Sequence, residues 1–218
     1  MALFTDRRDA GRKLAKKLAA YANRSDVLVL ALPRGGVPVA YEVALALHAP
    51  LDIFIVRKLG LPGHEELAMG AIATGGALVI NQDVVRTFNV PQGLIEAVAK
   101  KELKELERRE RVFRGDRPMR EIRGKTVVLI DDGLATGASM HAAILGIRSK
   151  QPARIVAAVP TAALETCEAF KQKVDEMICA MTPEPFYGVS RWYEDFSQTS
   201  DEEVQSLLEE ASQHAVHK

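Results

Sequence analysis

The sequence of 218 residues is 47% hydrophobic, and its 29 Lys and Arg residues balance 29 Asp and Glu residues to a formal net charge of zero. This length and composition predict one globular domain over residues 1–218, and the charge balance argues against a general attraction to nucleic acid or to an anionic membrane. No apolar run approaches the roughly 18 residues that a membrane-spanning helix needs, and the N-terminus is too charged for a secretory signal. Cys167 and Cys179 have neither metal-ligand spacing nor a disulfide framework around them, so we expect buried thiols in a cytoplasmic protein.

Strands and helices alternate along the chain. The first helix is expected over residues 5–23, where Leu14, Leu18 and Tyr21 recur on one side. Apolar runs of strand type follow at 27–32, 51–56, 126–131, 154–160 and 175–181. Further helices are expected through 40–47, over 91–114, 137–149 and 161–172, and after a capping box of Ser200 and Glu203. The Gly-rich residues between 59 and 81 predict a mobile loop followed by a hairpin.

This order of elements predicts a fold class and the place of a site. Continuously apolar strands that alternate with helices favour a mostly parallel sheet flanked by helices, which is an α/β fold. In such sheets, ligands bind beyond the carboxyl ends of the strands. Three candidate ends stand out, at residues 33–36, 57–58 and 131–139.

The strand over 126–131 ends in two adjacent carboxylates, Asp131 and Asp132, and a loop of small residues leads from them into the next helix. Like charges this close raise each other's pKa unless a cation or hydroxyl groups neutralise them. The loop offers backbone N–H groups at a helix N-terminus, which favours a phosphate group, and Thr136 and Ser139 add hydroxyl donors. Carboxylates for hydroxyls beside amides for a phosphate describe a ribose 5-phosphate site. A strand-to-helix turn with a chance acidic pair is the alternative.

The pattern VVLIDDGLATGAS at 127–139 resembles the signature of the type I phosphoribosyltransferases. The resemblance implies a Rossmann-like core over about 27–160 and a small hood built from terminal segments, especially about 182–198. It also implies that Asp131 and Asp132 hold the ribose hydroxyls of phosphoribosyl pyrophosphate (PRPP). The loop that wraps the 5-phosphate would then consist of Gly133, Leu134, Ala135, Thr136, Gly137, Ala138 and Ser139.

A second loop of this resemblance is ALPRGGVP at 31–38, which corresponds to the family's pyrophosphate loop. Gly35 and Gly36 can offer backbone amides to the diphosphate, and Arg34 can supply charge-assisted contacts. The family often has a cis peptide here, and we expect it at the Arg34–Gly35 bond. A Pro/Gly turn with a solvated arginine is the alternative.

Arg57 and Lys58 end the second predicted strand, where the family often places basic residues near the pyrophosphate. Together with Arg34 they form the expected catalytic set, which neutralises the leaving group. A solvated strand end explains Arg57 and Lys58 equally well. Residues 59–66 correspond to the family's flexible loop, which closes over the reacting centre.

The implied reaction belongs to nucleotide metabolism and transfers 5-phosphoribosyl from PRPP to a nitrogen of a heterocyclic, nucleobase-like acceptor, with release of pyrophosphate. Mg²⁺ is the implied cofactor and rests mainly on substrate oxygens, with Asp131 and Asp132 as candidate ligands. The acceptor stays open. Ala135 stands where 6-oxopurine enzymes have an aspartate, and the loop is closer to that of uracil-type enzymes, which usually lack the second aspartate.

Five aromatic residues lie close together near the C-terminus, namely Phe186, Tyr187, Trp192, Tyr193 and Phe196. Aromatic side chains that pack an irregular segment onto the core are the ordinary explanation. The alternative is that this segment belongs to the hood and that Tyr187 or Trp192 stacks on the ring of the acceptor.

Two other functions remain open, namely a PRPP-sensing regulatory protein and a non-catalytic phosphoribosyl-binding protein. A regulator should carry a DNA-binding module or a strongly basic face, whereas this chain has no net charge and no recognisable helix-turn-helix.

The charged helix over 91–114 contains Glu–Arg pairs in the favourable order and is expected to be solvated. Neither nucleic acid nor a membrane is an expected partner; a homodimer is compatible with the family.

Overall fold

The computed structural model describes residues 2–216, without the side chains of residues 65, 66, 215 and 216. Its main sheet has five strands, all parallel, in an order that does not follow the sequence. This confirms the predicted mostly parallel α/β fold. In spatial order the strands are β2 (Leu51–Ile53), β1 (Val27–Ala31), β6 (Thr126–Ile130), β7 (Arg154–Thr161) and β8 (Glu176–Met181).

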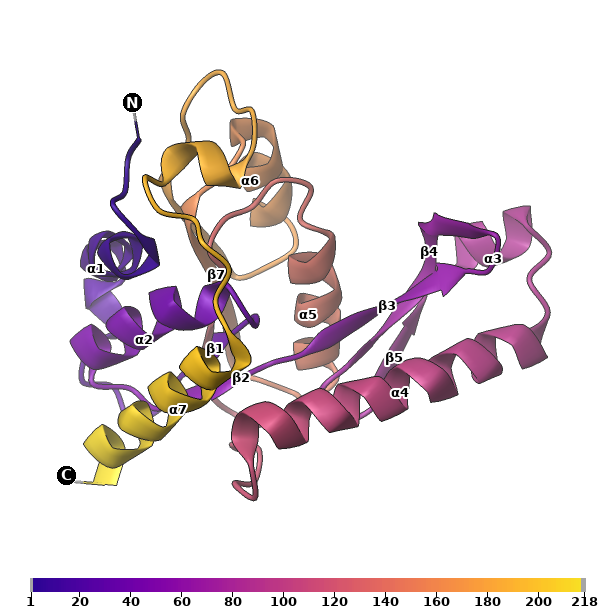
Figure 1. Cartoon of the computed structure of the whole chain (residues 1–218), viewed down its shortest axis with the longest axis horizontal. Coiled ribbons are helices and arrows are strands. Elements are labelled where there is room, and N and C mark those ends of the chain that lie inside the picture. The colour runs from indigo at the N-terminus through magenta and orange to yellow at the C-terminus, as the bar shows by residue number, and fades with distance from the viewer. Residues whose placement is uncertain (1, 217–218) are drawn as a thin grey trace.

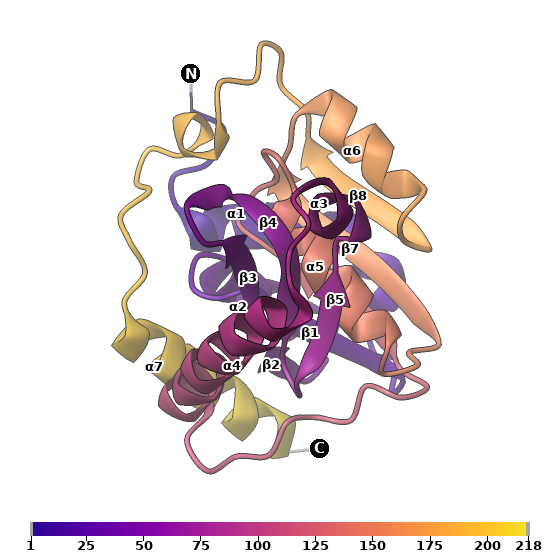
Figure 2. The ribbon, with the colours of Figure 1, turned by 90° about the vertical axis from the view of Figure 1, so that its right-hand side faces the viewer.

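Helices cover both faces of this sheet (Figures 1 and 2). Because side chains alternate along a strand, the registered residues Val29, Val128 and Val156 join one hydrophobic cluster, while Leu30 and Leu129 join the other. The first cluster is covered by α1 (Arg7–Lys17), α2 (Gly36–Leu47) and α7 (Asp201–Val216), and the second by α5 (Ala138–Arg148) and α6 (Leu164–Lys171). A sheet buried on both faces explains why its strands read as continuous apolar runs.

The chain between β2 and β6 forms a second unit, which we call the arm and which projects from the core (Figure 1). Its three strands are antiparallel, and a long helix packs against them. The elements of the arm are β3 (Val56–Leu61), β4 (His64–Ala73), β5 (Ala77–Ile80), α3 (Gln82–Thr87) and α4 (Gln92–Arg114).

The arm corrects two predictions. The run 51–56 is not one strand, because the chain leaves the parallel sheet after Ile53, and Val56 already belongs to the antiparallel sheet. Residues 59–66, expected as a flexible loop, lie at the end of the β3–β4 hairpin, where Leu61 pairs with His64 around a short turn. The predicted helix over 91–114 is confirmed as α4, which begins one residue later.

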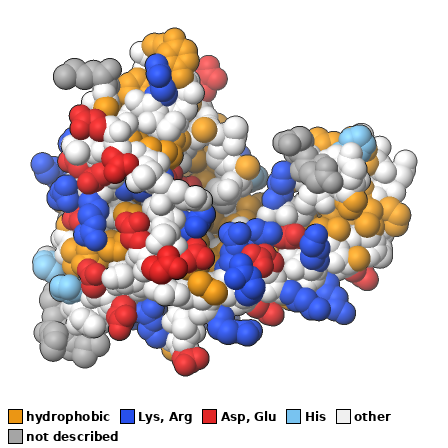
Figure 3. All heavy atoms as spheres, viewed as in Figure 1, with side chains coloured by type: hydrophobic (Ala, Val, Ile, Leu, Met, Phe, Trp, Pro, Cys, Tyr) orange, Lys and Arg blue, Asp and Glu red, His pale blue; other side chains and the backbone are white. Residues whose placement is uncertain are grey.

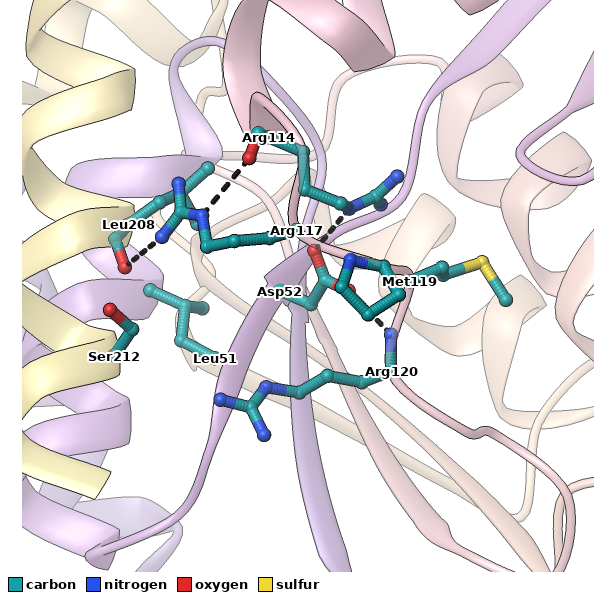
Figure 4. A pocket seen from close by; sticks show the side chains of 9 residues that line it. Leu51, Asp52, Arg114, Arg117, Met119, Arg120, Leu208 and Ser212 are labelled. Atoms are coloured by element: carbon teal, nitrogen blue, oxygen red, sulfur yellow. Dashed lines mark hydrogen bonds and ion pairs between the residues drawn. The ribbon is translucent and has the colours of Figure 1, made fainter. Parts of the chain in front are cut away.

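A buried ion pair joins the arm to the core (Figure 4). Arg114, the last residue of α4, donates through Nε to Asp52 Oδ1 on β2 at 3.0 Å, and both side chains are less than 10% exposed. The backbone N–H of Arg120 donates to the other oxygen of Asp52 at 2.9 Å. These contacts fix the base of α4 against the sheet, next to a cavity of about 260 Å³.

Two further features bear on the predictions. Ser200 Oγ accepts a hydrogen bond from the backbone N–H of Glu203 at 3.1 Å, which confirms the Ser200 half of the predicted capping box. Cys167 and Cys179 form a disulfide, so the expectation of free thiols is wrong: α6 packs on β8 and brings their Cα atoms to 6.5 Å, within bridging range. None of the helices in the described part of the chain combines the length and the apolar character needed to cross a membrane.

Candidate functional site

The acidic pair lies at the carboxyl end of β6, in the middle of the main sheet. Asp131 and Asp132 follow a strand whose five residues are all buried. The backbone N–H of Asp132 donates to Asp131 Oδ1 at 2.9 Å, which fixes the first carboxylate against the turn. Both residues are partly exposed, so they lie at the rim of the sheet rather than in the core.

The loop after β1 packs directly against this acidic pair because β1 and β6 are neighbours in the sheet. A Cβ atom added to Gly35 would lie 2.0 Å from Asp132 Oδ2, and one added to Gly36 would lie 2.8 Å from the carbonyl oxygen of Ile130. Glycine is therefore required by the close approach of the two loops. A cis peptide does occur in this loop, but at Pro33–Arg34 rather than at the expected Arg34–Gly35 bond.

Arg7 at the start of α1 supplies the cation that two neighbouring carboxylates need. Its Nε donates to Asp132 Oδ2 at 2.8 Å, and its side chain is only 11% exposed. No motif marks this residue in the sequence, because it is one of several Arg and Lys residues on an amphipathic helix and lies 125 positions away from its partner. The one sequence feature that indicates a nearby cation is the uncompensated negative charge of Asp131 and Asp132.

Burial raises the pKa of both aspartates, and the charge of Asp132 raises the pKa of Asp131 further. Burial is the first cause of the raised pKa of Asp131, and the negative charge of Asp132 adds to it. Burial also raises the pKa of Asp132, whereas the hydrogen bond and the positive charge of Arg7 oppose that rise. The site therefore stores electrostatic repulsion that a ligand with hydroxyl groups, or a cation, would relieve.

The loop over 133–139 presents open backbone at the start of α5. Ala135, Thr136, Ala138 and Ser139 are exposed, whereas Leu134 is buried and its N–H donates to the carbonyl oxygen of Thr161 at 2.9 Å. Gly137 precedes the helix with φ of 75°, a conformation that favours glycine. Because Leu134 is anchored in the core while most of the loop is exposed, the first N–H groups of α5 are accessible to an anion.

The α6 helix supports this loop from behind. Thr166 Oγ1 donates to the carbonyl oxygen of Ala135 at 2.8 Å. A Cβ atom on Gly137 would lie 2.5 Å from the ring of Phe170, so helix and loop are in close contact. Because the Cys167–Cys179 disulfide ties α6 to β8, it also holds this support in place.

Two of the three predicted catalytic cations do not end a strand of the main sheet. Arg57 and Lys58 lie inside β3 of the arm, which corrects the expected position. Side chains alternate along a strand, and Arg57 pairs with Glu102 of α4 at 2.6 Å, whereas Lys58 lines a cleft on the α5 side. Arg34 remains in the loop after β1, with its Nη1 3.4 Å from Asp201 Oδ1.

The cleft between the arm and α5 has a volume of about 650 Å³. The space-filling view shows the molecule hollowed between core and arm, with hydrophobic side chains in the hollow (Figure 3). Lys58 and Ile80 lie on its arm side, and Ala138 and Ser139 on its core side. The structure thus brings Lys58 and the end of the 133–139 loop to one cleft.

The aromatic segment near the C-terminus lies across the acidic pair. Tyr193 Oη donates to the carbonyl oxygen of Asp132 at 2.5 Å, and a Cβ atom on Gly133 would lie 2.4 Å from Val189 Cγ1. Burial raises the pKa of Tyr193, so its hydroxyl stays a proton donor. Tyr187 is 75% exposed, whereas Trp192 is half-buried and stacks on Phe186 with ring centroids 6.4 Å apart.

The donor set suits a magnesium ion carried by a phosphate ligand. Within residues 2–216, apart from the side chains that are not described, no group of three or more His, Cys, Asp or Glu residues could hold a metal ion. Two adjacent carboxylates are present at the rim, and Mg²⁺ is commonly bound through one or two carboxylates plus substrate phosphates. Asp131 and Asp132 therefore fit this mode of binding.

Comparisons with known proteins agree with this geometry. A family model described as the phosphoribosyl transferase domain matches residues 5–184. Two Mycobacterium tuberculosis proteins, from strains CDC 1551 and H37Rv and provisionally named phosphoribosyl transferases, are each 46% identical over 211 residues. The match covers 97% of this chain and 47% of each relative, so the chain spans about half the length of these curated relatives.

Among solved structures, TT1426 from Thermus thermophilus has a TM-score of 0.85 and 41% sequence identity to this chain. The match covers 96% of this chain and 99% of that one, so it includes the arm as well as the core. The acidic pair, the two loops at the carboxyl edge of the sheet and the family match over residues 5–184 lead to one conclusion. The chain belongs to the phosphoribosyl transferase family and has the type I fold, a mostly parallel sheet flanked by helices.

Proposed function

We propose that this protein transfers the 5-phosphoribosyl group from PRPP to a ring nitrogen of a heterocyclic acceptor and releases pyrophosphate. The observation that carries the proposal is the packing of the acidic pair. Gly35 and Gly36 lie against Asp132 and Asp131 with no room for a Cβ atom. An open helix N-terminus follows within seven residues. Ribose, diphosphate and 5-phosphate would thus each meet a suitable group within one edge of the sheet.

Asp131 and Asp132 would accept hydrogen bonds from the two ribose hydroxyls. Each contact offsets part of the burial that raises the pKa of both aspartates and of the repulsion that adds to it at Asp131. The N–H groups of residues 135–139 would bind the 5-phosphate, helped by the hydroxyl groups of Thr136 and Ser139. These are binding groups, and neither aspartate acts as a nucleophile in this scheme.

The chemical step breaks the bond between the anomeric carbon and the pyrophosphate oxygen and forms a bond to the acceptor nitrogen, and a proton carried by that nitrogen passes to water. Negative charge then develops on the departing pyrophosphate, and preorganised donors and cations lower the barrier by stabilising it. We assign this role to the backbone N–H groups of Arg34 and Gly35, to the Arg34 side chain and to Lys58 of the arm, whereas the Gly36 N–H donates to the carbonyl oxygen of Leu32 at 3.1 Å. Mg²⁺ bound to the substrate would supply further neutralisation of the pyrophosphate charge.

Arg57 receives a different role from the one that the sequence predicts. Its pairing with Glu102 at 2.6 Å turns it toward α4, on the face of β3 opposite the cleft. We therefore assign Arg57 to the packing of the arm. Lys58, which shares the cleft with Ser139, is the residue of the pair that we place near the substrate.

The acceptor would enter beside the segment over 189–197, which packs on Gly133 and Asp132. Trp192 Nε1 is buried and has no hydrogen-bond partner among the described residues, so this segment has an unused donor close to the site. Ala135 offers no hydrogen-bonding side chain, which disfavours a 6-oxopurine acceptor. The 75% exposure of Tyr187 shows that its ring is available for contact but not enclosed.

A direct test incubates the protein with Mg²⁺ and PRPP against a panel of purines, pyrimidines and other heterocycles. Pyrophosphate release that depends on one acceptor supports the proposal. Tight binding of PRPP without release for any acceptor would instead identify a PRPP-sensing or non-catalytic binding protein. Absence of PRPP binding at millimolar concentration would contradict the assignment of the site as a whole.

A further inference from the structure

Arg7 lies at the start of α1 and contacts both the acidic pair and the C-terminal segment. We propose that Arg7 is a positioning residue that orients Asp132 for the donor and couples donor binding to the segment over 189–197. The inference rests on the proposed function for the identity of the donor. The physical coupling itself can be measured without it.

The Arg7 guanidinium makes three contacts at once. Nε donates to Asp132 Oδ2 at 2.8 Å, and Nη1 donates to the carbonyl oxygen of Ser197 at 2.6 Å. The guanidinium carbon lies 3.9 Å from the centre of the Phe196 ring, in the geometry of a cation–π contact. A planar fork with several donors makes these contacts together, whereas a lysine ammonium is a single point charge on a flexible stem.

The same segment also holds the backbone of Asp132. Tyr193 Oη donates to the carbonyl oxygen of Asp132, and the Tyr193 ring packs between Phe4 and Phe196 with centroid distances of 5.2 and 4.9 Å. Phe4 and Tyr193 are paired as in a parallel sheet. Side chain and carbonyl of one aspartate are therefore held by the N-terminal and C-terminal segments together, so a change at either segment reaches the acidic pair.

This arrangement leaves part of Asp132 for a ligand. Arg7 occupies Oδ2 and leaves Oδ1 without a side-chain donor among the described residues. A ribose hydroxyl would meet the free oxygen of a carboxylate whose orientation is already fixed, which lowers the entropic cost of binding. The positive charge of Arg7 also reduces the repulsion between the two aspartates and the phosphate groups of the donor.

Arg8, the next residue, provides the comparison. It lies 3.4 Å from Glu42 and 5.2 Å from the ring centre of Tyr41, and its side chain is 42% exposed. These contacts hold α1 on α2 and do not reach the acidic pair. Arg8→Gln is therefore a matched control, because it removes one positive charge and one ion pair from the same helix.

The chain contains a single tryptophan, and Trp192 lies within the coupled segment. Its emission reports on that segment alone, and exposure to water shifts tryptophan emission to longer wavelength. We expect Arg7→Gln to red-shift this emission in the absence of any ligand, because the segment loses its contacts at Phe196 and Ser197. Arg7→Lys should restore the charge but not both hydrogen bonds, and its shift should be intermediate.

The test measures the emission of Trp192 and the Kd for PRPP with Mg²⁺ in the wild type, Arg7→Gln, Arg7→Lys and Arg8→Gln, with thermal unfolding as the check of folding. We expect Arg7→Gln to bind PRPP at least tenfold more weakly, Arg7→Lys to fall between, and Arg8→Gln to match the wild type in both readouts.

A double-mutant cycle with Asp132→Asn should show that the losses in affinity are not additive. Unchanged affinity and emission in a folded Arg7→Gln protein would overturn the inference and leave the proposed function intact. A wild-type protein that does not bind PRPP would overturn the proposed function, and a red shift in Arg7→Gln alone would then show that the coupling exists without the donor assigned here.

Discussion

The main sheet and the arm differ in how closely their residues are packed. Every residue of β1 and of β6 is buried, and the loops that leave these strands touch at Gly35 and Asp132. In the arm, none of the residues of β5 or α3 is buried, and the large apolar side chains of Leu78 and Phe88 are exposed by 48% and 44%.

This difference in packing suits the two regions to different roles at the site. Binding groups need a scaffold that fixes them to within a fraction of an ångström, and the buried strands of the main sheet supply it. Segments with few buried contacts lie at the low end of local stability, from which closing elements are drawn. Within the arm, β5 and α3 have this character, whereas β3 and α4 bury Leu59 and Leu106. The arm carries Lys58 on the cleft side, so we expect it to contribute charge to the reaction rather than to define the donor site.

The largest predicted effect concerns the junction of the two regions. Arg114→Leu should lower the free energy of unfolding by about 3–5 kcal/mol, because it leaves the buried carboxylate of Asp52 without its cation. Arg109→Leu, which removes an exposed pair with Glu105 on the same helix, should change it by less than about 1 kcal/mol. Urea denaturation measures both. Equal losses in the two variants would show that the arm is not anchored by this buried pair.

The second prediction compares glycines of the two regions. Gly35→Ala should weaken PRPP binding about 100-fold, equivalent to about 2.7 kcal/mol, because the new Cβ atom would lie 2.0 Å from Asp132 Oδ2 and 3.2 Å from Arg7 Nε. Gly93→Ala on α4 has nothing within 4 Å of the new atom and should bind PRPP as the wild type does. Calorimetric titration with PRPP and Mg²⁺ checks both, and normal binding by Gly35→Ala would break the proposed contrast.

The third prediction separates the two faces of β3. Lys58→Gln should lower kcat/KM for the acceptor reaction about tenfold, or about 1.4 kcal/mol, because it removes a cation from the cleft beside Ser139. Arg57→Gln removes a cation that pairs with Glu102 and should leave kcat/KM within threefold of the wild type. The reverse ranking would return Arg57 to the catalytic set that the sequence predicts.

The smallest predicted effect is a gain in stability. The folded-state pKa of Asp131 is raised above its ordinary value of 3.8, so the folded protein loses stability as the pH rises through the window between the two values. The loss grows as the pH rises through this window, and Asp131→Asn should remove it while keeping the acceptor for the Asp132 N–H. We expect the Tm to rise by about 2–4 °C, equivalent to about 1 kcal/mol. At pH 3 the gain should vanish, and a lower Tm at neutral pH would contradict this account.

The sequence predicts the main sheet well because its signals are local. The strands at 126–130 and 154–161 end within one residue of the predicted bounds, since each is an apolar run closed by polar or small residues. The run at 51–56 contains no such break, so the transfer of the chain from the parallel sheet to the arm could not be read from it.

The residues of the site also differ in whether local sequence signals predict them. The acidic pair and the small-residue loop are contiguous and could be found from their spacing. The contact between Arg7 and Asp132 spans 125 positions, and the pairing of Cys167 with Cys179 depends on how α6 packs on β8. Such contacts are set by the tertiary structure, and no pattern in the neighbouring residues indicates them.

The measurement that tests the central claim most directly is a calorimetric titration of PRPP with Mg²⁺ into the wild type and into the double variant Asp131→Asn with Asp132→Asn. The account predicts saturable binding by the wild type and an affinity at least 100-fold lower in the variant, with no loss of thermal stability. Equal affinity in the two proteins would show that the acidic pair does not hold the ribose.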